Sequence, residues 1–363
     1  MKGNFLEREY FYDSNMQKDE RVAIVGNCLE QLIAIILKNT YSGEIDYYSM
    51  AIEDLSFRVW FDKEGYFIRS ALKCNETGIE KKLWNIDKQI IIGDEAEAKK
   101  ALDHSLSTYG YAIVRTADVY LEFSKNFDEA CVNNDTFDYN TFPEKGHVIL
   151  IIGEDEKSYF YIDQPNELNM NYYTHAKGRR DIGVYPKKKF MEAFRHYLCL
   201  LFVEFNEERI RNPDEVGSRI IKKTVDNFYN NYFGDVPEND SYNILGGRAA
   251  LYKLDEMLDQ KKIVLNKKVF SFTFMAYKNY TIGAELLNGM TSIINRRKVM
   301  KGYLLEKNRG ELTLEDDLNM WKRAKEIVLY QCSRGDIVLR KEDIGFEQIV
   351  EAEEKLFDVL QHV

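Results

Sequence analysis

Three residues of the chain could together perform nucleophilic catalysis: Cys28, His147 and Asp163. Gly26 and Asn27 predict a turn and a cap, and a strongly apolar helical pattern follows, so Cys28 is expected in the first turn of a buried helix. The unpaired N–H groups at a helix start stabilise a thiolate, which is the reactive form of cysteine. Cys28 is therefore the candidate nucleophile.

The candidate base and its partner fall on a predicted β-hairpin. Two apolar runs rich in β-branched or aromatic residues flank a polar turn at 154–158, which is typical of antiparallel strands. Counting across this turn pairs Asp163 with a position near Gly146 or Val148, and so places it beside His147. The imidazole could then take the thiol proton while the carboxylate holds the ring. The spacing predicts a Cys-His-Asp triad.

The same three residues also permit a purely structural interpretation. Cys28 would be a core thiol, His147 a strand-end histidine and Asp163 a turn former. We favour catalysis, because three matching roles at suitable positions are harder to obtain by accident than one. The other cysteines lack a histidine and an aspartate in a comparable arrangement and are expected to be structural: Cys74, Cys131, Cys199 and Cys332. None forms a C-x-x-C pair, so no metal site is predicted.

Helices and strands that could position the triad are predicted around it. A helix is expected over 94–107, ending at a turn at 109–110, with a strand over 111–115. Pro186 opens a further helix, and residues 198–205 read as a last strand. This order predicts helices packed on strands in one layered domain.

Beyond Asn206 the sequence pattern becomes helical. Apolar residues repeat with helical spacing in five segments: 216–233, 246–260, 268–306, 314–331 and 345–361. Asn212, Pro213 and Asp214 interrupt the pattern, and we expect a domain boundary there. The predicted domains are a catalytic domain over 1–210 and a helical domain over 211–363.

Composition excludes several classes of protein. Apolar residues make up 45% and charged residues 30% of the chain, as in a globular protein. The net charge of −10 disfavours nucleic-acid binding. The apolar runs fall far short of the about 18 residues that a membrane-spanning helix needs. The first residues interleave charges with aromatics and show no signal peptide, so a cytoplasmic location is expected and no membrane partner.

The features above resemble the papain-like cysteine clan, in particular its bacteriocin-processing peptidase branch. More specifically, residues 1–205 are similar to the amino-terminal domain of the butirosin biosynthesis protein H family. The resemblance rests on Asn27-Cys28 before the helix, on the run 109–114 leading into Asp118-Val119-Tyr120, and on Gly146-His147 with Ile162-Asp163. It implies an α+β fold, with a Cys-bearing helix packed on an antiparallel sheet and an additional carboxy-terminal helical region.

The resemblance also implies an activity. Amide-forming enzymes of closthioamide-type antibiotic biosynthesis look similar, so the chain is expected to be an acyltransferase of secondary metabolism. It would move an acyl or aminoacyl group from a carrier-protein thioester, through acyl-Cys28, to a small amine. No cofactor of its own is expected, because the acyl or peptidyl carrier protein brings the phosphopantetheine. The alternatives are a cysteine peptidase or amidase with the same triad, and a catalytically silent binding protein on this fold.

The sequence departs from the papain-like pattern near the nucleophile. Papain-like peptidases usually carry a glutamine six residues before the cysteine, but Val22 stands there, and the Cys-Gly-Ser-Cys-Trp motif is absent. An oxyanion would need other donors, and the Cys28 N–H and the Asn27 side chain are candidates, although Asn27 could equally be only a helix cap. Asp118 and Tyr120 are the other residues that we assign to oxyanion or substrate binding.

One basic cluster interrupts the acidic background. His175, Lys177, Arg179 and Arg180 precede three consecutive lysines at 187–189. Carrier proteins are acidic and present a phosphate, so Lys177, Arg179, Arg180 and Lys187 are candidates for carrier docking. The alternative is a solvated loop followed by an exposed helix start.

Overall fold

The computed structural model describes residues 28–41, 52–53, 55, 58–69, 83–124, 126–133, 146–163, 182–231, 242–272, 277–307, 314–335 and 338–363. The chain divides into two compact units, one made of residues 1–45 and 84–205 and the other of residues 46–83 and 206–363. This division differs from the predicted one chiefly in the segment 46–83, which the prediction assigned to the first domain. The fold combines helices with antiparallel sheets and is of the α+β class.

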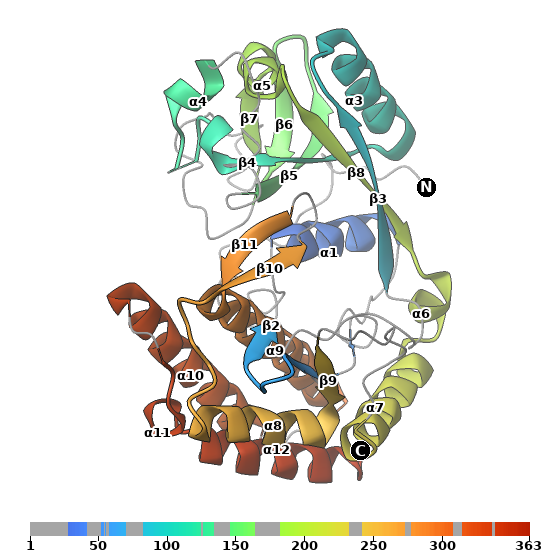
Figure 1. The fold of residues 1–363 in the computed structure, drawn as a ribbon. Helices are drawn as coiled ribbons and strands as arrows, with labels where there is room; N and C mark the ends of the chain where they lie inside the picture. The colour runs from blue at the N-terminus through green and yellow to red at the C-terminus, as the bar shows by residue number, and fades with distance from the viewer. Residues whose placement is uncertain are drawn as a thin grey trace. The chain divides into compact units, whose positions relative to one another are not determined.

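A six-stranded sheet forms the centre of the first unit (Figure 1). Its strands lie in the order β3-β8-β4-β5-β6-β7, and each neighbouring pair is antiparallel. The predicted hairpin is present as β5 and β6, and the predicted strands after the glycine turn and at 198–205 are β4 and β8. Their bounds are β3 Trp84–Ile91, β4 Ala112–Ala117, β5 Gly146–Glu154, β6 Ser158–Ile162, β7 Gly183–Pro186 and β8 Leu198–Phe205.

The helices of this unit include the predicted Cys-bearing helix. It begins at Cys28, and its apolar positions Leu32, Ile33, Ile36 and Leu37 are completely buried, as their spacing predicts. This helix contacts β5. The helical elements are α1 Cys28–Thr40, α3 Glu95–Tyr109, the 3₁₀ turn η2 Asp118–Tyr120, α4 Glu129–Asn133 and α5 Lys187–Phe194.

One face of the sheet packs against α3 and α5. Alternate residues of the central strands, such as Val114, Ile149 and Ile151, form a buried cluster with Leu102 of α3 and Phe190 of α5. The sequence of α3 fixes both of its ends. The side chain of Asp94 accepts a hydrogen bond from the backbone N–H of Glu97, and Gly110 adopts a left-handed conformation with φ of 80° at the other end.

The second unit is not purely helical, which corrects the sequence prediction. Strands from the segment 46–83 pair with β9 in a three-stranded sheet of order β2-β1-β9, and β10 and β11 form a separate antiparallel pair. The strand bounds are β1 Arg58–Phe61, β2 Phe67–Arg69, β9 Asn243–Gly246, β10 Lys268–Phe272 and β11 Tyr277–Thr281.

Helices make up most of the rest of the second unit. Their bounds are α6 Glu207–Arg211, α7 Pro213–Tyr229, α8 Gly247–Asp259, α9 Ile282–Glu306, α10 Leu314–Arg334, α11 Lys341–Ile344 and α12 Phe346–Leu360. Four of the five predicted segments are confirmed. The fifth, 268–306, is wrong over its first third, because β10 and β11 precede α9. The hydroxyl of Thr281 accepts from the N–H of Ala284 and so caps the helix start after the strands.

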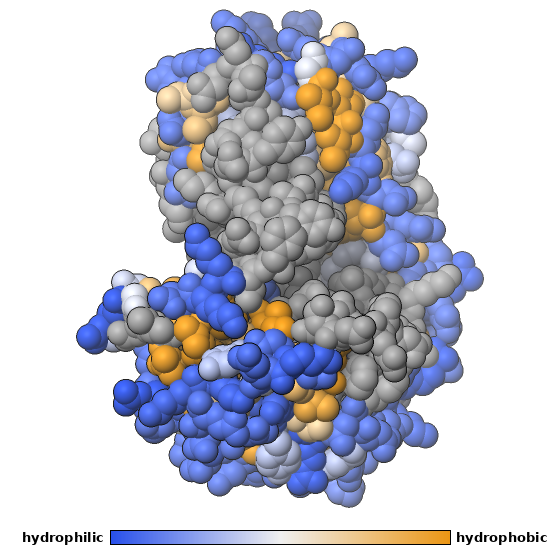
Figure 2. Space-filling model, in the orientation of Figure 1, coloured by the Kyte–Doolittle hydropathy of each residue, from blue (hydrophilic) through white to orange (hydrophobic). Residues whose placement is uncertain are grey.

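Apolar side chains of the described residues are mostly buried in these cores. On the face drawn in Figure 2 the described residues are mainly hydrophilic, with small hydrophobic areas between them. The most exposed large apolar side chains in the described ranges are those of Ile92, directly after β3, and of the adjacent Leu329 and Tyr330 on α10. None of the helices in the described ranges combines the length and apolar character needed to cross a lipid bilayer.

The cap of α3 gives a direct test of this local structure. Replacing Asp94 by alanine removes the acceptor for the Glu97 N–H and should lower the free energy of unfolding by about 1 kcal/mol. Asp94→Asn keeps an acceptor and should stay within a few tenths of a kcal/mol of the wild type. Denaturant titration measures both. Equal stability of the alanine and asparagine variants would contradict the assigned cap.

Candidate functional site

His147 and Asp163 lie in direct contact. The Nε2 atom of His147 is 2.7 Å from Oδ1 of Asp163, and the two side chains are only 14% and 5% exposed. His147 is the second residue of β5, and Asp163 directly follows β6. The predicted proximity of the two residues is therefore confirmed, and the contact is shielded from water.

The strand register that creates this contact differs from the predicted one. Near the turn Glu154 pairs with Tyr159, but after an extra residue at Ile152 the pairing shifts, so that Leu150 pairs with Ile162. The next position along places Asp163 opposite Ile149, not opposite Gly146 or Val148. Ile149 and His147 are two residues apart and share a face of the strand, so the carboxylate reaches the ring as a diagonal neighbour.

The bulge is necessary for that arrangement. If the register near the turn continued unchanged, Asp163 would lie opposite Leu150, on the face away from His147. A one-residue change of register exchanges the two faces of a strand. The extra residue at Ile152 therefore brings the two side chains to the same side of the sheet.

The contact specifies which imidazole nitrogen can act as a base. A carboxylate only accepts hydrogen bonds, so a neutral ring in contact with it carries its proton on Nε2 and its lone pair on Nδ1. A proton taken up at Nδ1 would make an imidazolium beside a carboxylate, which stabilises it. The carboxylate of Asp163 can therefore orient the imidazole and stabilise its protonated form during proton transfer.

The structure gives the backbone position of the candidate nucleophile. Cys28 is the first residue of α1, the helix that contacts β5, so its backbone N–H lies among the unpaired groups of the helix start. The side chain of Cys28 lies outside the described part of the structure, as does Asn27 entirely. The structure thus brings His147 and Asp163 together and starts the helix at the expected residue, while the position of the sulfur is not described.

A further polar residue beside the pair was not predicted. Thr116 of β4 is the cross-strand partner of His147, and it is 1% exposed. Within the described ranges its Oγ1 atom has no hydrogen-bond partner. Directly opposed side chains of an antiparallel pair lie close together, so Thr116 supplies a buried hydroxyl next to the imidazole. The pairing of β4 with β5 spans more than thirty residues along the chain, and only that long-range register could have identified it.

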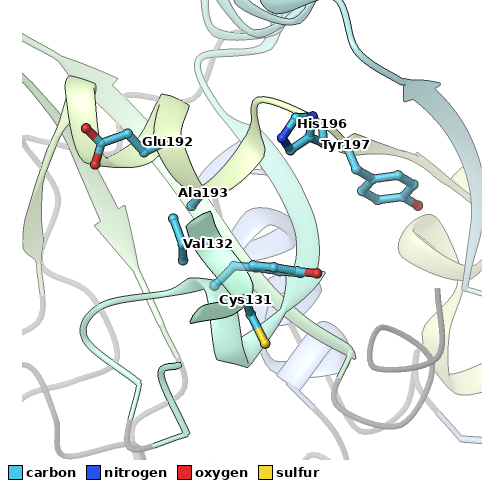
Figure 3. A pocket seen from close by; sticks show the side chains of 7 residues that line it. Cys131, Val132, Glu192, Ala193, His196 and Tyr197 are labelled. Atoms are coloured by element: carbon cyan, nitrogen blue, oxygen red, sulfur yellow. The ribbon is translucent and has the colours of Figure 1, made fainter. Parts of the chain in front are cut away.

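The structure places Asp118 and Tyr120 in the short turn η2 that follows β4. Oδ2 of Asp118 accepts a hydrogen bond of 2.5 Å from Nδ2 of Asn126, and its Oδ1 is buried without a partner in the described ranges. Tyr120 lines a small pocket of about 240 Å³, a volume that includes its opening to solvent (Figure 3). Neither His147 nor Asp163 lines that pocket.

The same pocket holds a cysteine and a histidine that are not arranged for catalysis. Cys131 and His196 both line it, but the sulfur points away from the ring in Figure 3. Nε2 of His196 accepts a 2.7 Å hydrogen bond from Nε of Arg195. This ring nitrogen is therefore engaged by a cation.

The candidate docking residues divide into two groups. Lys177, Arg179 and Arg180 lie outside the described residues. Lys187 is described, and its ammonium group is 2.7 Å from Glu154 and 5.3 Å from the centre of the Tyr159 ring. The neighbouring lysines, Lys188 and Lys189, pair with Glu192, and Lys189 also pairs with Glu122. The charge of the α5 start is therefore largely compensated within the unit.

The described residues contain no group of three potential metal ligands. Two other cysteines are poorly suited to react. Burial raises the pKa of the Cys199 thiol and that of the Cys332 thiol. Both are therefore predominantly thiols at neutral pH, which makes them suitable internal references for the reactivity of Cys28.

Thiol alkylation at pH 7 tests the site. Cys28 should react with iodoacetamide at least about tenfold faster than Cys199 and Cys332, because a helix start and a nearby histidine favour the thiolate. His147→Ala should slow the alkylation of Cys28 and leave the alkylation rates of Cys199 and Cys332 unchanged. His104→Ala, which removes an exposed histidine of α3, should not slow the alkylation of Cys28. Mass spectrometry of the peptides measures each rate.

A Cys28 rate no faster than those of Cys199 and Cys332 would contradict the assigned nucleophile. Equal rates in the His147→Ala and His104→Ala variants would contradict the assigned base.

No protein-family model matches the chain, and no curated protein was found to be similar to it. Its function has to be argued from the residues themselves.

Proposed function

We propose that the protein is a cysteine-dependent acyltransferase with a papain-like Cys28-His147-Asp163 triad, which forms an amide bond from a carrier-protein thioester. The contact between His147 and Asp163 is the observation that carries the proposal. A shielded imidazole–carboxylate pair has a clear use in proton transfer, and a helix that starts at a cysteine and contacts the same strand supplies a nucleophile.

The reaction has two steps. The Cys28 thiolate attacks the carbonyl carbon of the thioester, the carbon–sulfur bond to the carrier breaks, and the phosphopantetheine thiol leaves with a proton from the His147 imidazolium. The amine then attacks acyl-Cys28, the imidazole takes the amine proton, and the bond from the acyl carbon to Cys28 breaks. An amide and the free enzyme result.

Asp163 assists both steps without exchanging a proton. Its carboxylate holds the ring through Nε2, which leaves Nδ1 as the nitrogen that would exchange the proton, and it would stabilise the imidazolium that forms in each half of the cycle. Because the pair is largely buried, its electrostatic interaction is stronger than in water. The transfer of the acyl group to an amine rather than to water would depend on excluding water from acyl-Cys28.

Trapping of the acyl-enzyme tests this function. After incubation with an acyl-loaded carrier protein and no amine, intact-mass spectrometry should show one acyl group on Cys28, and none in Cys28→Ala. Added amine should discharge it as the amide. His147→Ala should lower the rate of acylation by at least about a hundredfold, and the contribution of a general base is typically of this size.

Two outcomes would overturn the proposal in favour of an alternative. Rapid hydrolysis of thioesters or peptides without any amine would identify a peptidase or amidase with the same triad. Absence of any Cys28 adduct with loaded carriers or small thioesters would favour a silent binding protein on this fold.

Recognition of the carrier can be tested separately from the chemistry. Arg179→Ala with Arg180→Ala should reduce turnover of a carrier-bound thioester several-fold, because the carrier is acidic, and should leave turnover of a small soluble thioester unchanged. Lys187→Ala is a matched control, since its charge is already paired with Glu154, and it should have little effect. Unchanged carrier-dependent turnover in the double variant would remove these arginines from the docking surface.

A further inference from the structure

A buried charged cluster in the second unit holds more negative than positive groups. Arg297 of α9, Asp317 and Trp321 of α10, and Glu353 of α12 are all 0% exposed. Nη2 of Arg297 is 2.7 Å from both carboxylate oxygens of Glu353, and its Nε is 3.0 Å from Oδ2 of Asp317. Of these three helices, α10 contacts both α9 and α12 (Figure 1).

The cluster has one formal positive charge and two carboxyl groups. The charged groups that face Asp317 within the described ranges are Arg297 on α9 and Glu353 on α12. The remaining polar partners are neutral: Trp321 donates from Nε1 to Glu353 at 2.7 Å, and the carbonyl of Leu55 accepts from Nη1 of Arg297 at 3.2 Å. With both acids ionised, the site would hold a net negative charge with no access to water, which is strongly unfavourable.

One oxygen of Asp317 shows where a proton can reside. Its Oδ1 is buried and receives no hydrogen bond from any donor in the described ranges. Asp317 and Glu353 share the guanidinium of Arg297, and two buried carboxyl groups beside one cation are more stable when one of them carries a proton. The Glu353 oxygens already accept from Arg297 and Trp321, which favours the ionised form there.

We propose that Asp317 is a neutral carboxylic acid in the folded protein at neutral pH, and that its Oδ1 hydroxyl donates a hydrogen bond to the Glu353 carboxylate. One cation then faces one anion, and every polar atom of the two acids has a partner. The cluster joins α9, α10, α12 and the backbone at Leu55, so the packing of the second unit is linked to the binding of one proton.

The coupling of folding to proton binding predicts how the stability of the protein changes with pH. Burial is the main cause that raises the pKa of Asp317 well above its ordinary value, Glu353 adds to it, and Arg297 opposes it. In the unfolded chain the pKa would be about 3.9. The folded protein therefore holds an extra proton above that pH. The resulting stabilisation is complete below about pH 3.9 and is lost as pH rises through the folded-state pKa.

Asp317→Asn tests the assignment, because an amide is neutral at every pH and has the same shape. Between pH 6 and 9 the unfolding constant of the wild type should rise relative to that of Asp317→Asn by up to tenfold per pH unit while the proton is retained. Asp316→Asn changes an exposed neighbour on the same helix and should keep the wild-type pH dependence. Denaturant titrations across the pH series measure all three proteins.

A second measurement does not depend on the folding of a variant. The infrared spectrum of the wild type in heavy water at neutral pH should contain the C=O stretch of a buried, protonated carboxylic acid. An ionised Asp317 would give no such band. If Asp317 is ionised, Asp317→Asn should also destabilise the protein at pH 7, because it removes the ion pair with Arg297. The pH dependence of stability from pH 6 to 9 would then be the same in the variant and the wild type. These results would overturn the proposal.

Discussion

The pairing of β5 with β6 changes register at Ile152, and the position of the His147–Asp163 pair depends on that change. Side chains alternate between the faces of a strand, so a carboxylate and an imidazole on neighbouring strands meet only if the register is correct. The bulge at Ile152 supplies the one-residue shift that brings the two side chains to the same face. It also lies away from the edges of the sheet, where both neighbours of β5 hold the strand in place.

Aromatic packing behind the hairpin holds β6 in this register. The ring of Tyr161 stacks on that of Phe123 with 4.7 Å between the ring centres, and the ring of Tyr159 packs edge-on against that of Phe190 with 4.9 Å between the centres. A Cβ atom on Gly183 would lie 2.3 Å from the Tyr161 ring, so β7 can pack this closely against β6 only because residue 183 is a glycine. Residue Asp163 leaves the sheet directly after this clamped strand, which limits the freedom of its carboxylate.

Local sequence signals identified most of the elements around the site. The apolar face and the turn at 109–110 located α3, apolar runs rich in β-branched or aromatic residues located β5 and β6, and the proximity of His147 to Asp163 followed from counting across the turn. The bulge at Ile152 could not be predicted, since no residue type in the hairpin marks the position of an extra residue. Thr116 was missed because its role depends on which strand lies beside it.

The errors in the second unit have a related cause. The segment 268–281 contains apolar residues at spacings that fit a helix, but β10 and β11 pair with each other, and Thr281 caps the helix only after them. The strands β1 and β2 contain few residues and gave no clear pattern. Their partner β9 is far along the chain, and long-range pairing overrides weak local preference.

The route of the chain through the two units affects how the protein can be made and dissected. Because β1 pairs with β9, the second unit is discontinuous in sequence, with the first unit's strands β3 to β8 synthesised between its two parts. Its three-stranded sheet can form only after β9, which ends at Gly246, has left the ribosome, and such distant contacts slow folding. A fragment ending at residue 210 would carry β1 without its partner β9, exposing an unpaired strand edge that favours aggregation. Because segments of the two units alternate along the chain, either unit can be isolated only by joining its two segments with a new linker, and not by truncation.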